Sequence, residues 1–160
     1  MKHKIIGVDP AIRKSGFAIA ILSNNLFRFE TFPNGFIEFI EWWQVFFFQS
    51  IDPVTFVVEN SNLQNASFHL NGPPPVIARM ARNVGMNQAI SQATVDYLRS
   101  QGQRVVELSP KEKGKKLTQD EFVALCQEHN VNISKRRTNQ DERDAGKLAL
   151  MGLNRCKMEL

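Results

Sequence analysis

Three short runs of β-forming residues fill the first part of the chain: Lys4 to Val8, Phe17 to Leu22, and Leu26 to Phe32. The segments between them, Pro10 to Gly16 and Asn24-Asn25, are rich in residues that favour turns. Strands joined by connections this short pair with their neighbours in antiparallel order. The sequence therefore predicts a three-stranded meander at the N-terminal end.

The rest of the chain alternates helical and strand patterns. A strand that follows a crossover helix usually runs parallel to a neighbouring strand, and the helix then covers one face of the sheet. We therefore predict an α/β fold with a mixed five-stranded sheet, three antiparallel strands followed by parallel ones, and helices on both faces. Its 160 residues suit one domain, residues 1–160. The later patterns are a helix from Phe36 to Gln49, a strand from Thr55 to Val58, a helix from Val76 to Gln101, a strand from Arg104 to Leu108, a helix opening after Thr118, and a helix from Gln140 to about Arg155.

Two features of the composition indicate a cytoplasmic protein with no membrane span. Cys126 and Cys156 have no paired spacing and no Cys/His cluster around them, which favours a reducing compartment and excludes a zinc site. The richest apolar stretch, Phe36 to Phe48, is interrupted by polar residues and too short to cross a bilayer.

Charge is modestly basic, with a formal net charge of +4 that suits a phosphate-bearing partner without requiring one. Much of the positive charge lies in two segments, Lys111 to Lys116 and Lys135 to Arg137. Taken alone, such a run is ordinarily a solvated surface. It becomes a candidate phosphate contact only where a catalytic site lies beside it.

Carboxylates follow two of the predicted strands. Asp9 comes directly after Ile5 to Val8, and Glu59 ends the run Phe56 to Val58. If the first and fourth strands are parallel neighbours, both acids meet at one edge of the sheet. A carboxylate at the end of a buried strand needs hydrogen bonds or a cation. Each acid taken singly could equally be a turn or cap residue.

Asp141 and Asp144 lie three positions apart at the start of the last predicted helix, so they project from the same face. The pair could merely complement the helix dipole. Together with Asp9 and Glu59, however, it forms a set of oxygen ligands whose mutual repulsion a divalent cation would offset. Oxygen-only ligands select Mg²⁺ or Mn²⁺ over zinc.

Three segments resemble the motifs of the RuvC-like Holliday-junction resolvases, a branch of the RNase H-like superfamily that includes phage and mobile-element members. Ile6-Gly7-Val8-Asp9-Pro10 with Ser15-Gly16 is similar to the opening motif of that family, Val57-Val58-Glu59 to its second acidic motif, and Asp141-Glu142-Arg143-Asp144-Ala145 to its C-terminal Asp-x-x-Asp-Ala helix. Two positions depart from the family pattern: Ala11 replaces a glycine, and no aromatic residue follows Glu59 closely. Phe68 is the candidate to replace that junction-stacking aromatic.

The resemblance implies an RNase H-like fold and a crossover junction endodeoxyribonuclease that hydrolyses phosphodiester bonds with two Mg²⁺ ions per active site, for which Mn²⁺ is expected to substitute. Asp9 would bridge the two ions, Glu59 and Asp144 would hold them from either side, and Asp141 would complete one shell. The same four residues are thus the predicted catalytic and metal-binding residues.

The resemblance also implies partners. Four-way junction DNA would be the substrate, and its near two-fold symmetry favours a homodimer to which the long helix contributes. A branch-migration helicase is an expected partner of cellular relatives. Basic residues beside the carboxylates would then contact phosphates. The predicted DNA-binding residues are Lys111, Lys113, Lys115, Lys116, Arg136, Arg137, Arg79 and Arg82.

Three other functions compete with this one. The same carboxylates would serve a nuclease acting on RNA-DNA hybrids or other branched DNA, because a fold and its metal site do not select the substrate. A catalytically silent nucleic-acid-binding module would also keep the fold, although the complete set of four acids favours an enzyme. Actin-like or sugar-kinase-like ATPases share an Asp-containing first strand, but they need a second domain for which this chain is too short.

Overall fold

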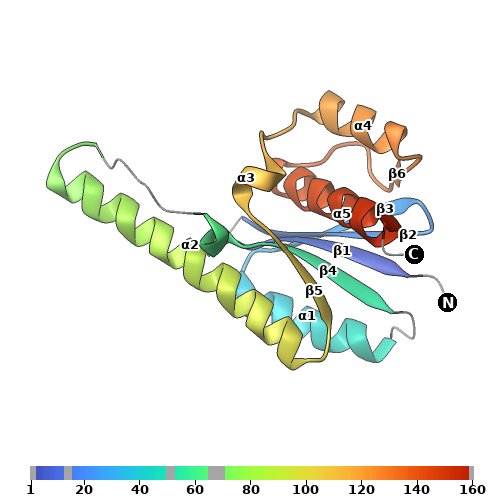
Figure 1. The fold of residues 1–160 in the computed structure, drawn as a ribbon, viewed down its shortest axis with the longest axis horizontal. Helices are drawn as coiled ribbons and strands as arrows, with labels where there is room; N and C mark the ends of the chain where they lie inside the picture. Colours follow the sequence, from blue (N-terminus) through green and yellow to red (C-terminus); the bar gives the residue numbers. More distant parts are fainter. Residues whose placement is uncertain (1–2, 13–15, 50–52, 65–70, 159–160) are drawn as a thin grey trace.

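The computed structural model describes residues 3–12, 16–49, 53–64 and 71–158. It contains one mixed sheet with the strand order β5-β4-β1-β2-β3-β6, flanked by helices (Figure 1). The strands are β1 (Lys4–Asp9), β2 (Phe17–Ser23), β3 (Leu26–Phe32), β4 (Val54–Glu59), β5 (Arg104–Leu108) and β6 (Asn132–Ile133). The helices are α1 (Phe36–Gln49), α2 (Pro74–Ser100), α3 (Pro110–Lys113), α4 (Gln119–Glu128) and α5 (Gln140–Met158), and a short 3-10 helix spans Ser61–Leu63.

Strand β1 lies in the middle of the sheet and has neighbours of opposite sense. It pairs antiparallel with β2 and parallel with β4, in a register that places Val8 beside Val58. The predicted meander is confirmed, and its β2–β3 turn uses Asn24 and Asn25 at positive φ, 53° and 57°. Because β1 and β4 run in parallel, Asp9 and Glu59 end at the same edge of the sheet.

Among the described residues the sheet has six strands, so the prediction of five was one short. The additional strand, β6, has only two residues and pairs parallel with β3 through Leu26 and Phe27. A strand this short has no alternation that a sequence pattern could reveal. It forms because the segment after α4 returns along β3, where Asn132 N–H donates to Asn25 O at 2.8 Å.

Helices cover both faces of the sheet, as predicted. Helices α5 and α4 pack on one face, where Leu148 and Phe122 are fully buried. Helix α1 and the C-terminal half of α2 pack on the other, around Phe39 and Trp43. Trp43 therefore belongs to the core, whereas Phe47 on the same helix is 48% exposed. The fold thus has a three-layer arrangement with two separate apolar cores.

Helix α5 lies unusually close to β1. A Cβ added at Gly7 would lie 1.9 Å from Ala145 O and 2.7 Å from Ala149 N, so only glycine permits this approach. The close packing brings the first turns of α5 beside the end of β1 and fixes where the α5 carboxylates lie.

Helix α2 projects beyond the sheet at its N-terminal end (Figure 1). Its buried residues, Ser91, Thr94, Val95 and Leu98, all belong to its second half. Within the described residues, the longest apolar helix still falls short of what a membrane crossing requires.

Candidate functional site

Two strands and one helix bring three carboxylates together. Asp9 ends β1, Glu59 ends the parallel neighbour β4, and Asp144 lies one turn into α5. The backbone of Asn60, just past Glu59, donates to Leu108 O at 2.8 Å, which ties the end of β4 to β5. Each acid is therefore carried by an element of the rigid scaffold.

A lysine occupies the space between these carboxylates. Lys113 Nζ lies 2.5 Å from Glu59 Oε2, 3.3 Å from Asp144 Oδ2 and 3.6 Å from Asp9 Oδ1. Lys113 is only 8% exposed. The sequence placed Lys113 among the surface phosphate contacts; the structure instead pairs it with the acids. The Ser-x-x-Glu spacing of Ser109 and Glu112 predicts a helix start directly after β5, but it does not indicate that the Lys113 side chain points to the acids.

The electrostatics of the cluster follow from its burial and its excess of negative charge. The pKa of Asp9 is raised to about 8: burial is the largest cause, Lys113 opposes the rise, and the negative charges of Glu59, Asp144 and Asp141 add to it. Burial alone would lower the pKa of Lys113, but Asp9 and Glu59 outweigh burial and raise it above the usual value. Lys113 is accordingly a charged ammonium at neutral pH.

Asp141, the fourth predicted acid, lies at the margin of this cluster. It is half-buried and lines a second hollow with Asn87 and Lys116. Burial and the nearby Asp144 raise its pKa. The first two turns of α5 therefore present one acid inside the cluster and one at its mouth.

The start of α5 is held by hydrogen bonds that sequence reasoning described only in part. Asn139 Oδ1 accepts from Glu142 N–H at 2.9 Å and so caps the helix, and Glu142 Oε2 accepts from Asn139 N–H at 2.9 Å. Arg143 Nε donates to Leu117 O at 2.9 Å. Gln140 Nε2 donates to Asp144 Oδ1 at 2.8 Å. Together these contacts fix the orientation of the first turns of α5, and the hydrogen bond from Gln140 orients the Asp144 carboxylate directly.

The donor set suits a hard divalent cation. It consists of carboxylate oxygens alone, and Glu59 Oε2 is buried without a hydrogen bond of regular geometry from the described residues. In the part of the chain that the structure describes, no three Asp, Glu, His or Cys side chains already have the arrangement of a metal site. The Lys113 ammonium lies where such an ion would contact Asp9, Glu59 and Asp144.

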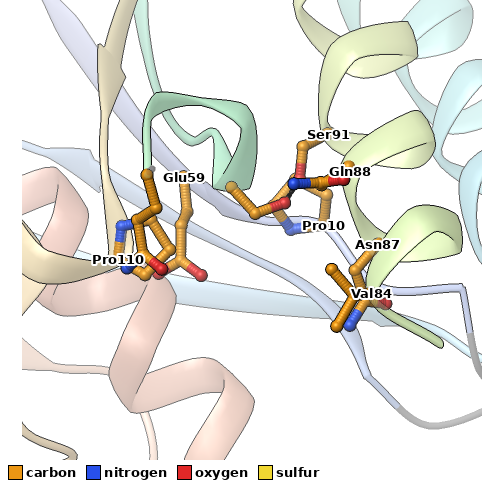
Figure 2. A pocket seen from close by; sticks show the side chains of 9 residues that line it. Pro10, Glu59, Val84, Asn87, Gln88, Ser91 and Pro110 are labelled. Atoms are coloured by element: carbon orange, nitrogen blue, oxygen red, sulfur yellow. Dashed lines mark hydrogen bonds between the residues drawn. The ribbon is translucent and has the colours of Figure 1, made fainter. Parts of the chain in front are cut away.

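A cleft of about 210 Å³ opens beside Glu59. Glu59 and Pro110 lie on one side of it, and Asn87, Gln88 and Ser91 of α2 lie on the other (Figure 2). Asn87 also lines the hollow that contains Asp141. Neutral hydrogen-bonding groups of α2 thus face the acids across the cleft.

The remaining predicted DNA-binding residues lie on several different surface elements. Lys111, Lys115 and Lys116 are exposed near α3, and Lys115 Nζ lies 2.7 Å from Glu121 Oε1. Arg136 and Arg137 are exposed between β6 and α5, and Arg79 and Arg82 are exposed on the projecting half of α2. Phe68, the candidate stacking residue, and the neighbouring loop lie outside the described residues.

Comparisons with known proteins find the same fold in a solved structure. No family model matches this chain, and no curated protein matches it either. A structure of RuvC from T. thermophilus in complex with Holliday junction substrate superposes with a TM-score of 0.57, covering 98% of this chain and 96% of that one at 16% identity. The chain therefore has the RuvC-type RNase H-like fold.

Proposed function

We propose that this protein is a Mg²⁺-dependent, structure-specific endonuclease that resolves Holliday junctions by paired phosphodiester hydrolysis. The observation that carries the proposal is the convergence of Asp9, Glu59 and Asp144, with Asp141 beside them, at one edge of a sheet with the RuvC-type fold. Four acids at one sheet edge cost folding energy that a structural role alone does not require.

Each acid has a role that follows from its place. Asp9 ends the central strand between the other acids, and Asp9, Glu59, Asp144 and Asp141 together would hold the divalent ions. Bound Mg²⁺ would activate a water molecule and stabilise the leaving oxygen. The chain's own residues fix the acids on β1, β4 and α5, so little reorganisation is needed when substrate arrives.

The exposed basic residues would bind the DNA backbone. Lys116 lines the hollow that contains Asp141, and Lys111, Lys115, Arg79, Arg82, Arg136 and Arg137 are exposed on other surface elements. Such contacts supply salt-dependent affinity and position the duplex without reading its sequence. RuvC of T. thermophilus is seen with a Holliday junction, and we propose branched DNA as the substrate here.

Cutting two opposed strands of a near two-fold junction requires two matched active sites, so we propose a homodimer in which the projecting half of α2 takes part. Its exposed Met80 and the partly exposed Val76 and Ile77 give that half an apolar component. A branch-migration helicase is a proposed partner, and the absence of paired cysteine spacing supports a cytoplasmic location.

The test is cleavage of a labelled synthetic four-way junction with Mg²⁺, beside linear duplex and RNA-DNA hybrid. Asp9→Asn replaces one carboxyl group of the cluster with an amide, and Asp120→Asn makes the same change at an exposed position on α4. Symmetric paired nicks in the junction, abolished by Asp9→Asn and retained by Asp120→Asn, support the proposal. Cleavage of the hybrid alone would reassign the substrate, and junction binding without cleavage of any substrate would indicate a silent binding module.

A further inference from the structure

Lys113 is a buried cation that none of the roles above uses. Its side chain is 9% exposed, and its ammonium contacts carboxylates from three different elements, β1, β4 and α5. An isolated buried ammonium would be costly, so its position depends on those acids. The three acids depend on Lys113 in turn, because among the described residues no second lysine or arginine lies within salt-bridge distance of them.

The backbone that carries Lys113 is firmly held. Ser109 and Glu112 form a reciprocal capping box at 2.7 and 3.2 Å, which fixes the single turn of α3. Arg155 of α5 contacts Glu112 at 3.0 Å, and Gly114 ends the turn at φ 73°. The backbone of Lys113 is therefore fixed by a capped helical turn, from which its side chain reaches the acids.

An ammonium in this place excludes a divalent ion from it. Mg²⁺ holds carboxylate oxygens at about 2.0–2.1 Å and Ca²⁺ at about 2.3–2.6 Å. Lys113 Nζ already lies 2.5–3.6 Å from oxygens of the same three acids, so an ion bound among them would overlap the ammonium. The two positive charges would also repel each other strongly in a buried site.

We propose that Lys113 is an exchangeable internal cation: its ammonium holds the Asp9, Glu59 and Asp144 carboxylates together in the metal-free protein and moves out when a divalent ion binds there. The inference rests on the divalent-ion site of the proposed function. The four-carbon stem of lysine permits such a movement while α3 stays in place. Lys113 is thus a positioning residue that keeps the acids assembled and sets how tightly metal binds.

The experiment compares Lys113→Met, which keeps most of the side-chain volume and removes the charge, with Lys111→Met, which makes the same change at an exposed position two residues away on α3. Calcium, as an ion expected to bind without supporting cleavage, is titrated by calorimetry, and thermal unfolding is followed in EDTA and in Ca²⁺. The buffer is held near about pH 9, so that protons compete little for the acids.

Removing the internal competitor should raise Ca²⁺ affinity about tenfold or more in Lys113→Met. The same variant should unfold at a lower temperature in EDTA and recover most of the loss in Ca²⁺. Lys111→Met should match the original protein in both measurements. If Lys113→Met does not fold in EDTA, circular dichroism during Ca²⁺ addition replaces the melt, and metal-driven folding is the expected result.

The proposal is overturned if Lys113→Met binds Ca²⁺ no more tightly than the original protein, or fails to fold at saturating Ca²⁺. Failure of the underlying metal site is distinguishable, because then the original protein itself would bind no Ca²⁺ and Asp9→Asn would change nothing. If the original protein binds Ca²⁺ and Lys113→Met binds it equally tightly, the metal site stands and only the exchange role of Lys113 is refuted.

Discussion

Replacing Gly7 with alanine should separate the sheet from α5 and disassemble the acid cluster. The added Cβ would lie 1.9 Å from Ala145 O and 2.7 Å from Ala149 N, and both atoms belong to helix backbone. No side-chain rotation can relieve such contacts. Helix α5 must therefore move, and Asp144 must move with it.

The size of the effect follows from that geometry. An ordinary contact starts near 3.4 Å, so α5 must shift by about 1.5 Å at Ala145. Overpacking in a core typically costs about 1–3 kcal/mol, and backbone clashes lie at the upper end, so we expect about 3 kcal/mol. For a chain of this size that lowers the melting temperature by about 6–12 °C. A displacement of about 1 Å at a catalytic group can cost about 100-fold in rate.

Thermal melts and junction cleavage measure the two consequences. Gly85→Ala is the matched control, because nothing lies within 4 Å of a Cβ at that position in α2. It should stabilise the helix by about 0.5–1 kcal/mol. If Gly7→Ala melts within about 1 °C of the original protein and cleaves at the original rate, the close α5 approach and the account of how the acids are positioned are both wrong.

Three further predictions concern the site and the cores. Because the pKa of Asp9 is raised to about 8, the folded protein holds a proton on Asp9 that a bound metal ion must displace. The Ca²⁺ affinity measured by calorimetry should therefore rise with pH and level off above about pH 8. An affinity that stays constant from pH 6 to 9 would contradict this prediction. Burial raises the pKa of the Cys126 thiol to about 12. In a Cys156→Ser variant, Cys126 should therefore react with iodoacetamide near neutral pH only after the protein unfolds. Rapid labelling of the folded protein would refute the burial of Cys126. Phe122→Ala should lower the free energy of unfolding in urea by about 3–5 kcal/mol, whereas Phe47→Ala, at a half-exposed position, should change it by less than about 1 kcal/mol; equal losses would show that the core is misplaced.

The fold was largely predictable because its signals are local. The apolar run Phe17 to Leu22, the alternation of Leu26 to Phe32 and the Asn24-Asn25 turn indicate the meander, and crossover rules then place β4 beside β1. Strand β6 was missed because two residues carry no periodicity, and α3 because a single turn is shorter than any helical pattern. Strand β6 forms through pairing with β3, far away in the chain, whereas α3 forms through the local capping box of Ser109 and Glu112.

The acids of the candidate site were predictable from the sequence, whereas the position of Lys113 among them was not. Asp9 and Glu59 follow strand patterns, and parallel pairing is enough to bring them together. The pairing of Lys113 with them depends on where α3 lies after β5, which no spacing within Lys111 to Lys116 reveals. Burial separates Lys113 from its exposed neighbours, and burial is a property of the fold.

The most direct test of the central claim, that the four acids form a divalent-metal site, is anomalous diffraction from crystals soaked in Mn²⁺. We predict a strong Mn²⁺ peak within coordination distance of Asp9, with Glu59 or Asp144 as a further ligand and the Lys113 ammonium moved away. No peak at this edge of the sheet at saturating Mn²⁺, with Lys113 still between the carboxylates, would contradict it.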